Sequence, residues 1–403
     1  MNNYSYEKLL KCNAIPVPTR NYDLVIIGCG ASGFAATIKA SEVSGGRASI
    51  AMVCKGPLGG TCVNVGCVPS KYLIEVSNRY FYSKRETKGV KLSAEVDFGT
   101  LMDGLREVVG ELRREKYEDV LGYYPNVELV RGSASFAGPS RVRVKTEDGE
   151  LELTGSRFII GVGSRPSVPP IRGLGEVSYL TSDSVWELRE LPRSLVVIGG
   201  GAIGLEIGQA LAHLGSEVTI VEAMDRVIPV PRVETEVSTA LAEYLEGEGL
   251  RVLVNSTVAE VKPEGRRKVV VVQRRGEVEK LKAEEVLVAT GRRPNTDELG
   301  LDRAGVKSDR RGYVIVDEHM RTSNPRIYAA GDCAAKELML ETLAAREGVV
   351  AAVNALTGDR ESVDYWGTPL VVFTTPQVAS VGLTEEELMR RESAPAGPSS
   401  STT

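Results

Sequence analysis

The chain carries two copies of one pattern, which is a short apolar run, a glycine-rich turn and a helical segment. The first apolar run is residues 23–27 and the second is residues 195–198. The glycines that follow are Gly28, Gly30 and Gly33 in the first copy and Gly199, Gly201 and Gly204 in the second. Glycine permits the tight turn and lets the backbone approach a pyrophosphate, and the helix N-terminus supplies amide donors. The repeat predicts an α/β fold with two Rossmann-like, three-layer units, each of which binds a dinucleotide.

The two copies differ at the end of their second strand, where a dinucleotide site usually has an acidic residue that binds a ribose hydroxyl. In the second copy, the strand at residues 217–221 ends in Glu222. In the first copy, the strand at residues 48–53 is followed by Cys54. We therefore expect the first site to keep its phosphate cradle and to lose one ribose contact.

After the first copy come two cysteines with four residues between them, Cys62 and Cys67, followed by Pro69. Proline favours the first turn of a helix, so we expect Cys67 to stand at a helix N-terminus. That position lowers the pKa of a thiol from about 8.5 and favours the thiolate, which is both the nucleophile and the soft-metal ligand. We interpret the pair as a redox-active disulfide. The alternative is two buried structural thiols, because free cysteine often behaves as a small buried hydrophobe.

The composition of the whole chain limits the classes of protein it can belong to. Its 403 residues are enough for two or three domains. Its formal net charge of -5 offers no basic surface, so we expect no nucleic-acid partner. No apolar run reaches the length of a membrane span, and the N-terminus lacks a signal-peptide core, so we expect a cytoplasmic protein.

The cysteines and histidines narrow the chemistry further. In a cytoplasmic protein we expect the six cysteines to form no structural disulfide framework, and we expect a paired set among them to be catalytic or metal-binding. The chain has only two histidines, His213 and His319. They leave little room for a histidine-based metal site or a histidine-centred catalytic triad.

The segment from Gly59 to Lys71 matches the redox motif of the FAD-dependent pyridine nucleotide–disulfide oxidoreductases, and residues 22–388 resemble that family. Within the family the chain is most similar to mercuric reductases. Three segments carry that closer likeness: residues 116–118, 320–325 and 372–379. Lipoamide dehydrogenases share the last two in looser form. The resemblance implies FAD and NAD(P)H as cofactors and Hg(II) as the substrate.

The resemblance also implies roles for individual residues. The first glycine set would bind the FAD pyrophosphate, and the second would bind the nicotinamide dinucleotide. Lys71 and Glu206 match an ion pair beside the flavin, where either charge alone would be costly to bury. The further residues implied in cofactor binding are Gly60, Thr61, Lys71, Ala134, Gly163, Glu222, Gly291, Gly331 and Asp332.

The mechanism implied by the resemblance centres on the cysteine pair. A hydride passes from NAD(P)H to FAD, and the reduced flavin opens the Cys62–Cys67 disulfide, with Cys67 nearer the flavin and Cys62 as the exchange thiol. The two thiolates then bind Hg(II), which is reduced to Hg(0). Tyr117 matches a tyrosine beside the inner metal site of mercuric reductases. The alternative is an aromatic residue on the core face of a helix.

The nicotinamide preference can be read from Glu222. A carboxylate there accepts a hydrogen bond from a ribose 2′-hydroxyl but repels a 2′-phosphate. Arg226 is the only nearby basic residue that could offset it. We therefore expect NADH to be preferred over NADPH.

The expected domain organisation follows from the same resemblance. It has a leader at 1–20, an FAD-binding domain at 21–166 and 290–364, an NAD(P)-binding domain at 167–289, a truncated α+β interface domain at 365–388 and a disordered tail at 389–403. Family members form homodimers through the interface domain, so dimerisation of this chain is left open. Two alternative functions also stay open: a dihydrolipoamide dehydrogenase-like disulfide reductase, and a truncated non-catalytic flavoprotein or soft-metal-binding protein.

Overall fold

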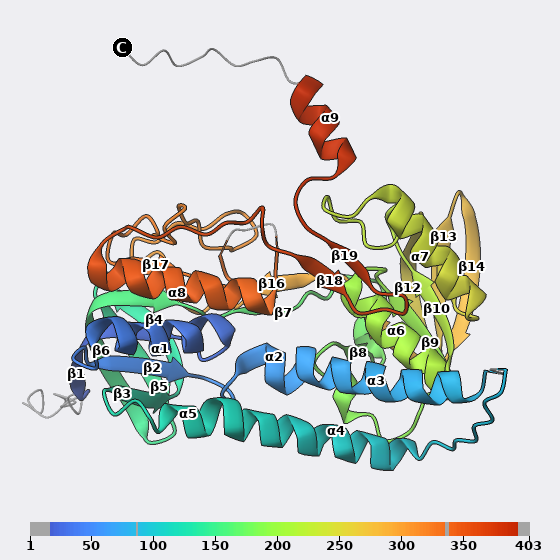
Figure 1. Cartoon of the computed structure of the whole chain (residues 1–403), viewed down its shortest axis with the longest axis horizontal. Coiled ribbons are helices and arrows are strands. Elements are labelled where there is room, and N and C mark those ends of the chain that lie inside the picture. Colours follow the sequence, from blue (N-terminus) through green and yellow to red (C-terminus); the bar gives the residue numbers. More distant parts are fainter. Residues whose placement is uncertain (1–16, 86–87, 335–337, 394–403) are drawn as a thin grey trace, which may run out of the picture.

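Two sheets, each with parallel strands at its centre, lie side by side along the long axis of the molecule (Figure 1). The computed structural model of the chain describes residues 17–85, 88–334 and 338–393. Helices cover both sheets, and a long helix pair runs beneath them from the first sheet towards the second (Figure 1). The doubled α/β architecture that the two glycine-rich turns predict is therefore present.

The first sheet is built around β1 (Thr19–Ile27), which pairs in parallel with β2 (Ile50–Cys54) and β6 (Gly149–Ile160). Its other strands are β3 (Val127–Arg131), β4 (Ser133–Gly138), β5 (Arg141–Thr146) and β17 (Ile327–Ala329). Residues 24–27 of β1 are at most 3% exposed, as a strand central to a covered sheet requires. On one face lie α1 (Ala31–Ser44) and α8 (Glu341–Thr357), whose buried residues share a core with β1 and β2.

The second sheet repeats this plan around β9 (Ser194–Ile198). Its order is β11 (Arg251–Leu253), β10 (Glu217–Val221), β9, β15 (Glu285–Val288) and β8 (Leu180–Thr181), all parallel. Its helices are α6 (Ala202–Leu214) and α7 (Thr235–Gly247). An antiparallel meander of β12 (Ser256–Glu264), β13 (Arg267–Arg274) and β14 (Glu277–Ala283) packs beside it.

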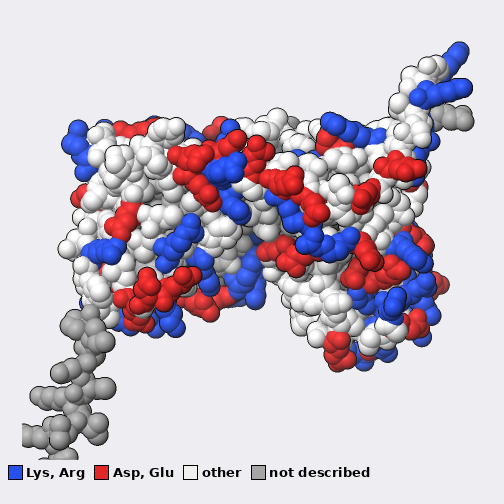
Figure 2. Space-filling model, turned by 90° about the horizontal axis from the view of Figure 1, so that it is seen from below, with Lys and Arg blue, Asp and Glu red and all other residues white. Residues whose placement is uncertain are grey.

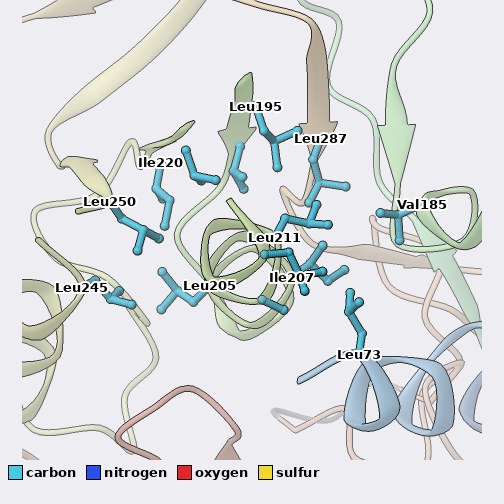
Figure 3. Packing of buried hydrophobic residues seen from close by; sticks show 14 of the residues in the cluster. Leu73, Val185, Leu195, Leu205, Ile207, Leu211, Ile220, Leu245, Leu250 and Leu287 are labelled. Atoms are coloured by element: carbon cyan, nitrogen blue, oxygen red, sulfur yellow. The ribbon is translucent and has the colours of Figure 1, made fainter. Parts of the chain in front are cut away.

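The cysteine segment connects the two halves. It forms α2 (Gly60–Val65) and α3 (Cys67–Ser83), and the chain then continues through α4 (Phe98–Arg113), a π-helical turn (Arg114–Glu118) and α5 (Asp119–Leu121). Leu73 of α3 belongs to the same core as Leu205, Ile207 and Leu211 of α6 (Figure 3). The helix that begins at Cys67 is thereby packed against the first helix of the second half.

Short strand pairs complete the connections. β7 (Ser164–Pro166) pairs with β16 (Arg292–Pro294), which joins the segment that follows β6 to the segment that follows β15. Two 3-10 turns, Leu174–Glu176 and Val185–Glu187, lie in the connection to β9. After α8, β18 (Leu370–Val372) and β19 (Val378–Ser380) form a hairpin, followed by α9 (Glu385–Ser393).

Two sequence-based boundaries are wrong at the ends of the chain. The leader was expected to reach residue 20, but β1 begins at Thr19, because the long strand β6 supplies partners for it from Glu152 onwards. The disordered tail was expected from residue 389, but α9 runs to Ser393. The side chain of Thr384 and that of Glu387 each bond the other's backbone N–H, a capping box that starts this helix. The rest of the leader and tail, including Cys12, lies outside the described residues.

One further difference concerns β6. The sequence predicts a strand at residues 151–153 and a second strand that begins at residue 158 and ends in a glycine-rich turn, whereas the structure has one strand from Gly149 to Ile160. Its first part pairs with β5 and its last part pairs with β17. The two ends of one continuous strand therefore have different hydrogen-bonded neighbours. The hairpin that the sequence predicts here is confirmed, but its turn is at Glu147 and Asp148 rather than at Asp148 and Gly149, because Gly149 already pairs with Thr146 as the first residue of β6.

The distribution of surface charge and the length of the helices can be compared with what the composition predicts. Positive and negative side chains are intermixed over the face shown in Figure 2. None of the helices in the described part of the chain is long and apolar enough to cross a membrane. The boundaries between the FAD-binding, NAD(P)-binding and interface domains, and the absence of a nucleic-acid partner, stay predictions.

Candidate active site

The turn between β1 and α1 leaves no room for side chains at two of its glycines. Gly28 has a φ of +118°, and a Cβ on it would lie 2.1 Å from the carbonyl oxygen of Gly161. A Cβ on Gly33 would lie 2.1 Å from the carbonyl oxygen of Gly28. Gly30 is the N-cap of α1, and none of the described side chains caps the helix there. We call this turn the first cradle, because its backbone amides are arranged as anion binding requires; the binding itself stays a prediction.

The turn between β9 and α6 repeats this geometry. Gly199 has a φ of +111°, and a Cβ on it would lie 2.4 Å from the carbonyl oxygen of Ala289. A Cβ on Gly204 would lie 2.1 Å from the carbonyl oxygen of Gly199. Gly201 is the N-cap of α6, again with no cap from a described side chain. Each half therefore has a glycine-rich turn of this geometry, its cradle, at the carboxyl end of its central strand, and phosphate binding there stays a prediction.

Glu222 stands directly after β10, beside the second cradle. Its carboxylate accepts hydrogen bonds from the backbone N–H of Gly200 at 2.6 Å and of Met224 at 2.7 Å. The residue is 6% exposed. Arg226, the basic residue expected to offset it, instead donates to the hydroxyl of Thr235 at 2.8 Å. The negative charge is thus fixed against the glycine-rich turn, where the sequence predicts a ribose contact.

The corresponding position of the first cradle holds a disulfide. Cys54, the last residue of β2, is bonded to Cys29, which lies between the first two glycines of the cradle. The expectation that the cysteines form no structural disulfide is therefore wrong for this pair. The error has a tertiary cause, since 25 residues separate the two cysteines and only the packing of β2 beside the β1–α1 turn brings them together. The sequence did contain a signal for this disulfide, because one cysteine lies between the first two glycines of the turn and the other lies at the end of the second strand.

The predicted redox cysteines lie at the junction of two helices. Cys62 is in α2 and Cys67 is the first residue of α3, with Gly66 between the helices. The position of Cys67 at a helix N-terminus is confirmed. Both cysteines are free, so the structure holds the dithiol form of the pair, and the expected Cys62–Cys67 disulfide stays a prediction.

The two thiols have opposite acidities. The hydrogen bond that Cys62 donates lowers the pKa of Cys67, and the positive charge of Lys71 lowers it further, against the opposing effect of burial. The same hydrogen bond, together with burial, raises the pKa of Cys62. Cys67 is therefore the more acidic thiol of the pair and Cys62 the less acidic one. This asymmetry agrees with the roles that the resemblance implies.

Lys71 and Glu206 form the ion pair that the resemblance implies. The Lys71 Nζ lies 2.8 Å from the Glu206 carboxylate, whose other oxygen accepts the backbone N–H of Phe373 at 2.9 Å. The ammonium also lies 4.2 Å from the centre of the Phe373 ring. α3, α6 and the segment after β18 thus meet at one charged contact. Sequence reasoning missed Phe373, because its contact depends on a segment about 300 residues away from Lys71.

Tyr117 lies in the π-helical turn after α4 and packs against Phe34 of α1, with ring centres 4.8 Å apart. Burial raises the pKa of its hydroxyl to about 12, and electrostatic interactions with Cys62, Glu341 and Cys67 act in the same direction. The phenol therefore keeps its proton near the cysteine pair. Its position agrees with both interpretations of Tyr117. It packs in an apolar cluster, as a core aromatic residue would, and it interacts electrostatically with the thiols, as a residue beside the metal site would.

Asp332 is held at the carboxyl end of β17. It accepts a hydrogen bond from the Ser164 hydroxyl at 2.6 Å, and the Arg292 guanidinium lies 3.8 Å away. Arg292 also donates to the hydroxyl and carbonyl oxygens of Ser164. Gly331, with a φ of +76°, abuts Ser32, because a Cβ on it would lie 2.8 Å from the Ser32 hydroxyl. The structure thus places the Gly331–Asp332 pair against the start of α1.

The other predicted cofactor residues fall at several places around the first cradle and the connecting strands. Gly60 faces Gly30, since a Cβ on it would lie 2.6 Å from the Gly30 Cα, and Thr61 is exposed beside it. Ala134 is half-buried in β4, two residues beyond Gly132, whose N–H bonds the Cys54 carbonyl oxygen. Gly163 and Gly291 have positive φ and flank β7 and β16. Their roles in binding stay predictions.

The donors present fit FAD at the first cradle through the backbone amides, Asp332 and the lysine of α3, with a disulfide where a carboxylate is usual. In the described residues, no group of three or more His, Cys, Asp or Glu side chains is arranged to hold a metal ion.

A family model described as pyridine nucleotide-disulphide oxidoreductase matches residues 22–348. The chain belongs to this family. Membership implies FAD and a pyridine nucleotide as cofactors, which agrees with the two cradles and the cysteine pair.

Two kinds of relative are similar in sequence. Mercuric reductase from Lysinibacillus sphaericus is 40% identical over 91% of this chain and 66% of its own length, and that from Streptomyces lividans is 40% identical over 91% and 77%. Dihydrolipoyl dehydrogenase from Geobacillus stearothermophilus is 37% identical over 91% of this chain and 76% of its own. The chain thus spans about two thirds of the length of the first of these relatives.

A solved structure agrees with the fold. The Cu(II) complex of the HOCl-induced flavoprotein disulfide reductase RclA from Escherichia coli superposes with a TM-score of 0.81 at 29% identity. The match covers 93% of this chain and 80% of that one.

Proposed function

We propose that the chain is a flavin-dependent oxidoreductase that passes two electrons from NADH to the Cys62–Cys67 pair and from there to Hg(II), which leaves as Hg(0). FAD, when bound, supplies the hydride acceptor between the nicotinamide and the cysteine pair. The observation that carries the proposal is the asymmetric pair, with a thiolate at Cys67 held by Cys62 and Lys71. Two thiols of this kind suit a soft, polarizable metal ion.

Each residue around the Cys62–Cys67 pair has a separate role in the proposed reaction. Cys67 keeps its thiolate through the hydrogen bond from Cys62 and the charge of Lys71. Glu206 holds the Lys71 ammonium in place while its second oxygen fixes the backbone at Phe373. Tyr117 retains its proton and so can donate a hydrogen bond towards the thiols. Glu341, in the first turn of α8, adds a negative charge that acts on both cysteines.

The proposed preference for NADH rests on Glu222. Its carboxylate is fixed by two backbone N–H groups beside the second cradle, so it cannot swing away from an incoming 2′-phosphate without losing both bonds. Arg226 is committed to Thr235. A higher kcat/KM with NADPH than with NADH would contradict this part of the proposal.

Disulfide reduction is the second candidate, favoured by the 37% identity to a dihydrolipoyl dehydrogenase. It normally needs a base near the exchange thiol. Both histidines of the chain are engaged elsewhere, His213 with Asn78 and Glu248, and His319 with the carbonyl oxygen of Glu361. This observation makes metal reduction the first candidate.

The test compares the two substrates in one preparation. The purified protein is given NADH with Hg(II) and excess small thiol, or NADH with lipoamide, and Hg(0) vapour and NADH oxidation are recorded. We expect vapour that requires NADH and disappears in Cys62→Ser and Cys67→Ser. Lipoamide reduction without vapour would select the second candidate. Bound flavin with neither activity would select a non-catalytic flavoprotein.

A further inference from the structure

Cys29 and Cys54 form a cysteine pair that the proposed reaction does not use. Their Cα atoms lie 5.4 Å apart, within the range of ordinary disulfides, and they are bonded in the structure. Cys29 is 6% and Cys54 1% exposed. The active-site cysteines, Cys62 and Cys67, are free in the same structure. Only the Cys29–Cys54 pair is thus joined by a disulfide among the described cysteines.

The cross-link lies where three parts of the cofactor site meet. Cys29 belongs to the phosphate cradle, and Cys54 occupies the strand end at which a ribose-binding carboxylate is usual. The carbonyl oxygen of Cys29 accepts the N–H of Gly59 at 2.9 Å, and that of Cys54 accepts the N–H of Gly132 at 2.9 Å. Gly59 is the N-cap of α2, so the same contact continues to the helix that carries Cys62.

We propose that Cys29 and Cys54 are a second, redox-sensitive pair whose disulfide holds the adenosine end of the FAD site closed and whose dithiol form loosens it. The proposal rests on FAD as the cofactor of the first cradle. A dinucleotide must contact both the cradle and the strand end, and a covalent bond between them fixes their separation before FAD arrives. Such preorganisation strengthens binding by reducing the ordering that binding requires. The disulfide thus compensates for the missing carboxylate.

The dithiol form is also accommodated by the surrounding residues. The Cys54 Sγ lies 3.0 Å from the carbonyl oxygen of Gly56, and the Cys29 Sγ lies 3.8 Å from that of Pro57. Each thiol would therefore have a backbone acceptor in the loop that leads from β2 to α2. The remaining neighbours are apolar, including Phe34, Met52 and Leu58. Neither state leaves an unsatisfied polar group at the pair.

The interconversion balances with ordinary oxidants and reductants. On oxidation, the two thiols lose two protons and two electrons and one S–S bond forms; hydrogen peroxide accepts them and yields two molecules of water. On reduction, a dithiol reductant attacks the S–S bond as a thiolate. It leaves as a cyclic disulfide, and Cys29 and Cys54 each regain a proton.

The test uses the holoprotein with both active-site cysteines replaced, Cys62→Ser together with Cys67→Ser, so that only the second pair responds. The protein is treated with hydrogen peroxide or with dithiothreitol, and alkylation with peptide mass spectrometry reports the state of Cys29 and Cys54. FAD release is followed by the rise in flavin fluorescence on dilution. We expect release to be about tenfold faster in the reduced protein, because preorganisation is lost.

Three variants make the result specific. Cys54→Ser should release FAD at the fast rate in both conditions. Cys333→Ser makes the same change at a buried cysteine outside the pair and should keep the redox difference. Cys54→Glu installs the usual ribose-binding carboxylate and should give slow release that no longer depends on redox state. Circular dichroism confirms that each variant is folded.

Equal release rates from protein with a mapped disulfide and protein with mapped thiols would overturn the proposal. So would alkylation of both Cys29 and Cys54 after peroxide treatment. A protein that binds no FAD in either state would instead overturn the flavin assignment, which separates the failure of the proposed function from that of this inference.

Discussion

The two glycine-rich units have nearly the same backbone and different chemistry at the end of their second strand. In both, the first glycine has a positive φ, and a Cβ on it would clash with the backbone just after a neighbouring strand. A Cβ on the last glycine would clash with the carbonyl oxygen of the first. Beyond this shared cradle, the second unit has Glu222 bonded to its own turn, and the first has Cys54 bonded to Cys29. The shape of the cradle is therefore set by steric limits on the backbone. The chemistry beside it, which would decide which nucleotide binds, depends on a single side chain.

The largest expected effect separates the two cradles. Gly28→Ala places a Cβ 2.1 Å from the Gly161 carbonyl oxygen at a φ of +118°, so we expect loss of bound FAD and a destabilisation above about 4 kcal/mol. Flavin absorbance of the purified protein and thermal unfolding measure this. In Gly201→Ala the Cβ meets nothing within 4 Å, so this control should fold and retain flavin. Full flavin content in Gly28→Ala would contradict the assignment of the first cradle.

The second prediction concerns the helix that joins the two units. Leu73 is 2% exposed and packs against α6, so Leu73→Ala should lower the free energy of unfolding by about 2–5 kcal/mol. Urea denaturation measures the change. Tyr82, on the same helix and 45% exposed, provides the matched position, and Tyr82→Ala should cost under about 1 kcal/mol. Similar costs at both positions would mean that α3 does not pack as described.

The third prediction uses the acidity of Cys67. Its pKa is lowered by the bond from Cys62 and by Lys71, so the thiolate persists as pH falls and is lost only below the lowered pKa. Lys71→Met removes the positive charge and should shift the alkylation profile of the reduced protein to higher pH. Iodoacetamide labelling across pH measures it, and Lys84→Met, further along the chain, should leave the profile unchanged. An unchanged profile in Lys71→Met would show that the ammonium does not act on Cys67.

The smallest expected effect tests the difference at the strand ends directly. Glu222→Gln keeps the shape of the side chain but removes its charge, so we expect the NADPH to NADH ratio of kcat/KM to rise about tenfold, equivalent to about 1.4 kcal/mol. Steady-state kinetics with both nucleotides measure it. Glu217→Gln, at the exposed start of the same strand, is the control. The comparison of the two units would need revision if the ratio did not move.

Much of the fold could be predicted because its signals are local. The turns after β1 and β9, the strand at Glu217–Val221 and the helix start at Cys67 each depend on residues within about one helical turn or one strand. Steric limits on glycine and proline act over that same range. α9 was missed although its capping box at Thr384 and Glu387 is equally local.

By itself, the sequence determined that the chain has two glycine-rich strand–turn–helix units and a cysteine pair at a helix start. The resemblance added the pairing of Lys71 with Glu206. Only the tertiary structure decided that Cys29 meets Cys54, that Phe373 completes the Lys71–Glu206 contact, and that β6 is one strand with different partners along its length. The physical reason is distance along the chain. Local patterns fix the backbone of single elements, whereas contacts between distant residues exist only after the sheets and helices have packed.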